Sequence, residues 1–171
     1  MPSADLPSEV QAILSDEPEL AFVEAYLVDI NGLLRGKRLP AGMLSRLYTK
    51  GINLPASTPL LDIWGEEVEG TGLILSTGDA DKCCHPVPHS LRPMPWTRRP
   101  AAQLLLAMVD DDGRGFAGDP RAKLAAIIER LAARGLRAVV RQDDGAWTRS
   151  PLERPRALLQ VRRVQHHHRH L

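Results

Sequence analysis

A predicted β-hairpin at residues 26–40 is the feature that most constrains how this chain folds. Two strand-like runs flank Asp-Ile-Asn-Gly at residues 29–32, and Asn-Gly favours the left-handed backbone conformations that a tight hairpin turn requires. Before the turn, apolar residues alternate with mixed ones, which is typical of a half-buried strand. The side chains expected on its buried face are those of Val23, Ala25 and Leu27.

The second strand of this hairpin carries several cations. Arg35 and Lys37 fall on one side of it, and Gly36 and Arg38 on the other. Charged side chains resist burial unless they are paired. Two interpretations are open: the strand is an edge that its charges protect from aggregation, or it is presented to an anionic surface.

The rest of the pattern predicts further helices and strands. We expect an amphipathic helix between Pro7 and Pro18, a helix that Pro40 begins and Gly51 ends, a central strand at 101–109, a helix that Asp119 caps and Gly135 ends, and a buried strand at 136–140. Residues 72–77 are a possible further strand. Residues 78–100 contain five prolines and indicate an ordered crossing segment with little periodicity.

Residues 52–70 combine turn formers with apolar side chains. Pro55 and Gly65 are two of the turn formers in this stretch, which favours a loop with a specific function. The apolar side chains either fold back on the core or enter a partner. These side chains are Leu60, Leu61, Ile63 and Trp64.

The composition points to an ordinary globular body. The 171 residues are 43% hydrophobic and 25% charged, with a formal net charge of +1, so nothing in the body implies a nucleic-acid or membrane partner. The longest apolar run, residues 104–109, cannot span a bilayer, and the amino terminus has no signal-peptide pattern. We expect a soluble cytoplasmic protein.

The two cysteines, Cys83 and Cys84, are adjacent in sequence. Neighbouring cysteines rarely form an unstrained disulfide, so we expect reduced thiols. His85 next to them suggests a metal site, but zinc sites take their ligands from two separated pairs.

Residues 141–171 differ in kind from the rest of the chain. They hold seven arginines against three acidic residues, a net +4, together with a cluster of four histidines and no sustained period. Such a composition is typical of a disordered segment. The histidines could also indicate a metal site, and the arginines a nucleic-acid arm.

Several short sequence motifs, in order along the chain, resemble the start of glutamine synthetase family sequences. They are Val-Asp-Ile-Asn-Gly at 28–32, Arg-Gly-Lys-Arg at 35–38, Leu-Pro-Ala-Ser at 54–57, Val-Asp-Asp-Asp-Gly at 109–113 and Asp-Pro-Arg at 119–121. The resemblance covers about residues 15–140 and is strongest to gamma-glutamylputrescine synthetases and related gamma-glutamyl-amine ligases.

The resemblance implies an α+β fold. It places a leading helix at 1–18, a β-grasp domain at 19–115, the first helix and strand of a truncated catalytic domain at 116–140, and an aberrant tail at 141–171. The implied reaction uses ATP to phosphorylate the side-chain carboxylate of glutamate, after which ammonia, putrescine or another polyamine displaces phosphate. Magnesium or manganese ions neutralise the phosphates in such a reaction.

The chain departs from the family where the metal ligands begin. The family has Glu-x-Glu on the strand that resembles residues 136–140, whereas this chain continues with Arg-Gln-Asp-Asp at 141–144. Adjacent residues of a strand point to opposite faces, so Asp143 and Asp144 cannot replace that pair. We therefore expect no catalytic residue, metal ligand or cofactor site in this chain, and we interpret the tail as the product of a frameshift near residue 140.

The resemblance also implies a subunit contact, because in these ring-shaped oligomers the amino-terminal domain completes the neighbouring active site. Ser57 and Trp64 lie in the matching loop, although an ordinary loop serine and a core indole are the alternative interpretation. Proline at position 55 stands where ammonia-using members carry an acid, which points away from free ammonia. The cations expected at the subunit boundary are Arg35, Lys37 and Arg38.

Two hypotheses about function follow. The first is an amino-terminal part of a glutamate–amine ligase that is inactive alone and belongs to a homo- or hetero-oligomer. The second is a non-catalytic subunit that docks into rings of a full-length relative. If the chain is truncated, the helix between Asp119 and Gly135 lacks a cover for its apolar stripe, and exposed stripes promote association. The stripe consists of Leu124, Ile127, Ile128 and Leu131.

Overall fold

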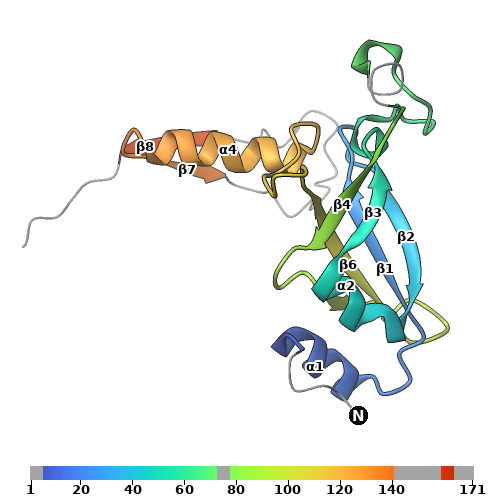
Figure 1. The fold of residues 1–171 in the computed structure, drawn as a ribbon. Helices are drawn as coiled ribbons and strands as arrows, with labels where there is room; N and C mark the ends of the chain where they lie inside the picture. The colour runs from blue at the N-terminus through green and yellow to red at the C-terminus, as the bar shows by residue number, and fades with distance from the viewer. Residues whose placement is uncertain (1–5, 73–77, 141–158, 164–171) are drawn as a thin grey trace, which may run out of the picture. The chain divides into compact units, whose positions relative to one another are not determined.

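The computed structural model describes residues 6–72, 78–140 and 159–163 (Figure 1). Contacts divide the chain into two units, Met1–Lys123 and Leu124–Leu171. The possible strand at 72–77 lies almost wholly outside the described residues, as do Asp143, Asp144 and the four histidines of the tail.

The first unit is built on one mixed sheet. Its strands are β1 (Phe22–Val28), β2 (Leu34–Pro40), β3 (Ile52–Pro55), β4 (Asp81–Pro86), β5 (Arg92–Pro93) and β6 (Ala101–Met108). The strand order in the sheet is β2-β1-β6-β4-β3, and β5 pairs additionally with β6. β1 runs parallel to β6, whereas the other described strand pairs of this sheet are antiparallel. Sheet and helices together give an α+β fold.

The predicted hairpin is confirmed. β1 and β2 pair from Phe22↔Pro40 to Val28↔Leu34. Of the Asn-Gly pair that was expected to favour left-handed conformations, Gly32 has a positive φ, +81°, and Asn31 does not. Gly36 is required for a second reason, because a Cβ there would lie 2.0 Å from the carbonyl oxygen of Ala25. The side chains predicted to face the core are all buried: Val23, Ala25 and Leu27.

Two helices complete the core of this unit. α1 (Ser8–Asp16) and α2 (Leu44–Lys50) form where the sequence predicts them, with the short 3₁₀ turn η1 (Ala41–Met43) before α2. Gly51 ends α2 with φ of +68°. The sheet and helices share one apolar cluster, whose members include Val10, Ile13, Leu27, Leu44, Leu47, Leu104, Leu106 and Met108.

Three strands of the first unit were not predicted. β3 opens the stretch at 52–70 that was interpreted as a loop, and β4 and β5 lie within the crossing segment at 78–100. These strands are rich in proline, cysteine and charge, so they lack the apolar alternation of a strand. Pairing with distant partners makes them strands: β4 joins β3 on one side and β6 on the other. The same loop contains two 3₁₀ turns, η2 (Thr58–Leu60) and η3 (Glu69–Thr71).

The two ends of the sheet come close together. β2 and β3 lie at opposite ends of the strand order, yet Lys37 Nζ donates a hydrogen bond of 3.0 Å to the carbonyl oxygen of Asn53. Among the described strands β2 pairs with β1 alone, and one of its charges connects it to the strand at the other end of the order.

The predicted central strand and the helix after it are also confirmed. β6 has neighbours on both sides, and its alternate side chains are buried. Asp119 precedes α4 (Pro120–Ala132) and is 2% exposed. Its Oδ1 accepts a hydrogen bond from the Arg121 N–H at 2.8 Å, and its Oδ2 accepts one from the Met108 N–H at 2.9 Å. One carboxylate thus caps the helix and joins it to the end of β6.

The second unit contains most of α4 and a two-stranded ladder. β7 (Leu136–Val140) pairs antiparallel with β8 (Leu159–Arg163), and Gly135 before β7 has φ of +68°. β8 lies within the region predicted to be disordered and obtains its regularity from β7. No described side chain of α4 is buried, and three of its apolar residues are about half exposed: Leu124, Ile127 and Ile128.

Candidate functional site

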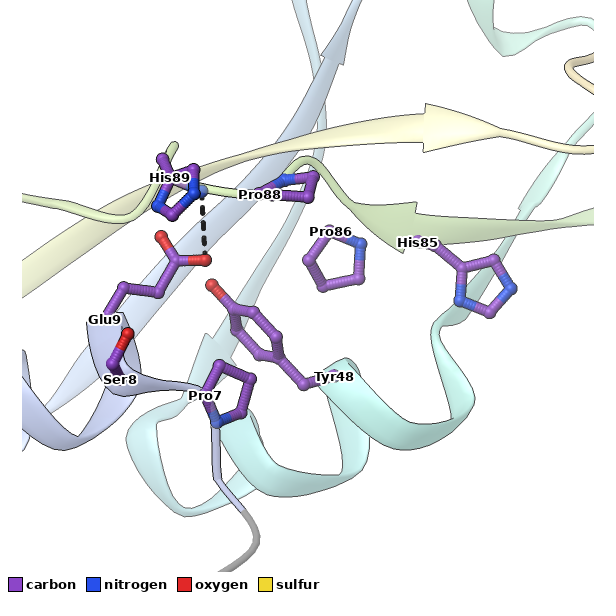
Figure 2. A pocket seen from close by; sticks show the side chains of 8 residues that line it. All are labelled: Pro7, Ser8, Glu9, Tyr48, His85, Pro86, Pro88 and His89. Carbon is purple, nitrogen blue, oxygen red and sulfur yellow. Dashed lines mark hydrogen bonds between the residues drawn. The ribbon is translucent and has the colours of Figure 1, made fainter.

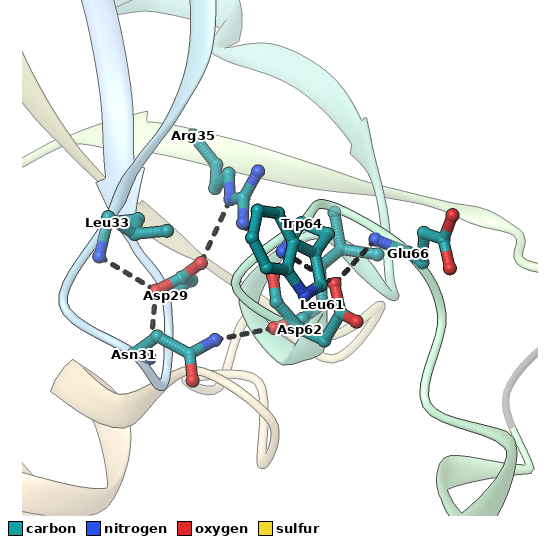
Figure 3. Close-up of polar contacts among 8 residues, drawn as sticks. All are labelled: Asp29, Asn31, Leu33, Arg35, Leu61, Asp62, Trp64 and Glu66. Carbon is teal, nitrogen blue, oxygen red and sulfur yellow. Dashed lines mark hydrogen bonds and ion pairs between the residues drawn. The ribbon is translucent and has the colours of Figure 1, made fainter.

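The hairpin turn is organised by one buried carboxylate. Asp29 is 2% exposed, and its Oδ1 accepts hydrogen bonds from the backbone N–H groups of Asn31 and Leu33, both at 2.8 Å (Figure 3). Its Oδ2 accepts from Arg35 Nε at 2.9 Å. This is the side-chain-to-backbone bonding that makes aspartate a good turn former. The turn therefore has one well-defined conformation.

Asp29 is ionised because its partners outweigh its burial. Burial alone raises the pKa of a carboxyl group, but hydrogen bonds from Arg35, Leu33 and Asn31 lower it further than burial raises it. The pKa of Asp29 consequently lies below its ordinary value. The ion pair with Arg35 is partly open to solvent, since the side chain of Arg35 is 21% exposed.

The turn also fixes the loop that follows β3. Three hydrogen-bond donors of the hairpin reach carbonyl oxygens of this loop: Ile30 N to Pro59 O at 2.9 Å, Asn31 Nδ2 to Leu61 O at 2.8 Å, and Arg35 Nη2 to Asp62 O at 2.7 Å. Arg35 thus contacts the turn and the loop at once. We call residues 29–35 and 57–66 together the turn–loop site.

Within the loop, Asp62 repeats the role of Asp29. Its Oδ1 accepts hydrogen bonds from the backbone N–H groups of Trp64 at 2.8 Å and Glu66 at 2.9 Å, and its own N–H donates to Glu66 O (Figure 3). Gly65 has φ of +87°, and a Cβ there would lie 3.0 Å from Arg35 Nη1. Backbone conformation and space both require glycine at this position.

The fixed loop presents apolar side chains to solvent. Trp64 is 81% exposed and Ile63 is 57% exposed, and the hairpin adds Ile30 at 65% and Leu34 at 58%. The core interpretation of Trp64 is therefore wrong, because the carboxylate-bonded turn directs the indole outward. Leu60 and Leu61 are half-buried.

Ser57 lies at the other end of the loop in a different environment. It is 7% exposed, its N–H donates to Asp79 Oδ1 and its hydroxyl donates to Asp79 Oδ2, both at 2.8 Å. Asp79 has a positive φ of +52°. The sequence analysis did not single out Asp79. Its place next to Gly78 is the only local signal, and the contact spans 22 positions.

The three cations of β2 all have partners in the chain. Arg35 pairs with Asp29 and Lys37 with the Asn53 carbonyl, as described above. Arg38 pairs with Glu24, its neighbour across the β1–β2 ladder, and its guanidinium lies 4.3 Å from the centroid of the Phe22 ring. Arg38 remains the most open of these ion pairs, with its side chain 63% exposed.

The described residues do not fit a divalent metal. Among them, no group of three or more His, Cys, Asp or Glu side chains comes together. The Asp29 carboxylate is occupied by three donors, and Lys82 Nζ lies between Asp110 and Asp111 at 3.0 and 3.2 Å. In the same part of the chain, no helix is long and apolar enough to cross a membrane.

Curated proteins similar to this chain are named as synthetases of gamma-glutamylputrescine or of glutamine. A gamma-glutamylputrescine synthetase, PuuA of Escherichia coli strain K12, is 41% identical over 132 residues, which are 77% of this chain and 28% of that protein. The glutamine synthetase of Pyrococcus abyssi is 28% identical over 133 residues, 78% of this chain and 26% of the relative. No protein-family model matches the chain.

Solved structures share the fold. A GmaS–ADP complex superposes with a TM-score of 0.57 at 22% identity, covering 84% of this chain and 32% of that one. A structure described as a novel glutamine synthase homolog gives a TM-score of 0.59 at 22% identity, covering 71% of this chain and 28% of the other. At this identity the likeness establishes the fold alone.

These matches cover most of this chain but only a small part of each relative. Each curated relative matches over about three quarters of this chain, but the chain spans little more than a quarter of the relatives' own length, 26 to 28%. The resemblance to the glutamine synthetase family is thus confirmed over about three quarters of this chain. The homologues of this chain are members of the glutamine synthetase family.

Proposed function

We propose that this chain is the amino-terminal part of a glutamate–amine ligase of the glutamine synthetase type, and that it is inactive alone. Residues 1–18 would be the leading helix, residues 19–115 the β-grasp domain and residues 116–140 the start of a catalytic domain. The 41% identity to a gamma-glutamylputrescine synthetase, over 28% of that protein, supports this assignment.

The reaction would join an amine to the side-chain carboxylate of glutamate with the use of ATP. Magnesium or manganese would be held by the catalytic domain of a full-length ligase. Putrescine or another polyamine is favoured over ammonia by the relative's name and by proline at position 55. The described residues would supply no catalytic group.

The contribution of this chain would be the turn–loop site, placed against the catalytic domain of a neighbouring subunit. The observation that carries this proposal is Trp64, an indole that is 81% exposed on a loop whose backbone is fixed by Asp29, Asp62 and Arg35. Exposed aromatic side chains on a preorganised backbone lose little entropy on binding and commonly dominate interfaces. Ser57, Lys37 and Arg38 would lie along the same boundary.

A chimera tests this proposal. Residues 1–140, followed by the catalytic part of the Escherichia coli gamma-glutamylputrescine synthetase, should form a ligase that consumes ATP with glutamate and putrescine, whereas the 171-residue chain should show no turnover. Trp64→Ala in the chimera should lower kcat/KM about tenfold. Trp96→Ala, at an indole that is 67% exposed on another loop, is the matched control.

The proposal fails if the 171-residue chain turns over substrate, or if the two tryptophan variants behave alike. The second candidate function, a non-catalytic subunit, is favoured by the exposed apolar side chains of the turn–loop site, Trp64 and Ile63. It predicts co-purification of the 171-residue chain with rings of a full-length relative. A monomer at micromolar concentration beside such rings would exclude it.

A further inference from the structure

Two adjacent cysteines of β4 have opposite environments. Cys84 is fully buried in the core, whereas Cys83 is half-buried on the other face of the strand. Side chains two positions apart in a strand share a face, so His85 lies on the same side as Cys83. The strand thus places one thiol beside an imidazole and encloses the other in apolar side chains.

Contacts from two elements hold the Cys83 thiol. Its S–H donates a hydrogen bond of 3.5 Å to the carbonyl oxygen of Lys50, the last residue of α2, and its Sγ lies 3.4 Å from His85 Nε2. A Cβ on Gly51 would come within 2.8 Å of the same sulfur. The sulfur is therefore packed against the end of α2, with a base at hydrogen-bonding distance.

His85 also borders a cavity. The cavity has a volume of about 240 Å³ and is walled by the start of α1, by Tyr48 and by the chain from His85 to His89 (Figure 2). Glu9 fixes the wall opposite His85 by accepting a hydrogen bond from the His89 N–H at 3.1 Å. The imidazole is itself exposed, so small solutes can approach the thiol–imidazole pair.

We propose that Cys83 and His85 form a peroxide-reactive thiol site, at which Cys83 is oxidised to a sulfenic acid while Cys84 is not. His85 Nε2 accepts the thiol proton, and the thiolate sulfur attacks one oxygen of hydrogen peroxide. The O–O bond breaks, and the sulfur keeps that oxygen as Cys–SOH. The departing hydroxide takes up the proton and leaves as water. Sulfur is oxidised and peroxide is reduced, so the step needs no other reactant.

Cys84 provides the contrast within the same strand. Burial raises the pKa of the Cys84 thiol to about 12, which keeps it protonated at neutral pH. Because the thiolate is the form that reacts, Cys84 should be inert to oxidants that modify Cys83. Cys83 and Cys84 are adjacent in β4, so local unfolding of this strand would expose both thiols together.

The test uses the 171-residue chain treated with hydrogen peroxide and dimedone, which traps sulfenic acids. Tandem mass spectrometry assigns the adduct to one of the two cysteines. We expect it on Cys83, with about a tenfold slower rate in the His85→Ala variant, which lacks the base. His89→Ala is the matched control, because His89 lines the same cavity and should leave the rate unchanged.

Alkylation by iodoacetamide gives a second readout that needs no oxidant and should rank the variants in the same order. Absence of any adduct, an adduct on Cys84 of equal yield, or a His85→Ala variant that reacts as fast as the unmodified sequence would each overturn the proposal. These measurements require neither a ligase partner nor turnover, so they are independent of the proposed function.

Discussion

β6 and α4 both carry a regular row of apolar side chains. In β6 the row is enclosed: Leu104 and Met108 are fully buried between β1, β4 and the helices of the core. In α4 the row stays open, with Leu124 54% and Ile127 51% exposed. Periodicity therefore predicts the element in both cases, but it does not say whether the chain supplies a cover for it.

The comparison bears on where the stability of this chain resides. The first unit has a continuous apolar core and buried carboxylates that satisfy backbone donors. In the second unit no described side chain of α4 is buried. We expect changes in β6 and around Asp29 to alter folding, and changes on α4 to alter association.

The largest effect is expected for Leu104→Ala in β6. Removing a fully buried leucine loses transfer free energy and leaves a cavity, which together cost about 2–5 kcal/mol. Urea denaturation monitored by circular dichroism measures the loss. Leu105→Ala, on the less buried side of the same strand, is the control and should cost clearly less. Equal losses for the two variants would show that β6 is not enclosed as described.

An intermediate effect is expected for Asp29→Ala. The change leaves two backbone N–H groups and the Arg35 guanidinium without their acceptor, which should cost about 2–3 kcal/mol of unfolding free energy. Arg38→Ala removes a solvent-exposed ion pair and should cost at most about 1 kcal/mol. Urea denaturation of the two variants at pH 7 compares them directly.

The pH dependence of the unfolding free energy, compared between the unmodified chain and Asp29→Ala, tests whether the charge of Asp29 causes the loss of stability. The folded pKa of Asp29 lies below the ordinary value of 3.8, so its contribution to stability is fully present above that value. The contribution is lost as the pH falls from 3.8 through the folded pKa. The advantage of the unmodified chain over Asp29→Ala should shrink across that window. A difference that stays constant would assign the loss to packing rather than to charge.

The smallest effect on stability is expected for Ile127→Ser on α4. The side chain is half exposed, so the free energy of unfolding should change by no more than about 0.5 kcal/mol. Association should fall, because an exposed apolar stripe promotes it. Light scattering against protein concentration measures this, with Ala126→Ser on the same helix as control. A large loss of stability without any change in association would mean that α4 is covered.

Local signals predicted much of this fold. The hairpin, α1, α2, β6 and α4 each carry their own turn, cap or period, as with Asn31-Gly32 for the hairpin and Asp119 for α4. β3 and β4 carry none, because their regularity comes from pairing with each other and with β6. The parallel pairing of β1 with β6 joins segments about 80 positions apart, and no short-range pattern specifies such a contact.

The candidate site was predicted in part. Trp64 and the cations of β2 were singled out, but their surroundings were not. Asp29 and Asp62 use their side chains on nearby backbone N–H groups, and aspartate within a turn is the signal that could have found them. The contact between Ser57 and Asp79 depends on the approach of two distant loops, which sequence spacing does not reveal.

Lys37 joins the two strands at the ends of the described strand order, β2 and β3, through a side chain rather than through a strand ladder. A ladder fixes many residue pairs together, so a shift by one position turns every side chain of the strand to the opposite face. A flexible lysine side chain imposes no such register. The contact between β2 and β3 therefore fixes no register, in contrast to the ladders that β1 makes with β2 and β6.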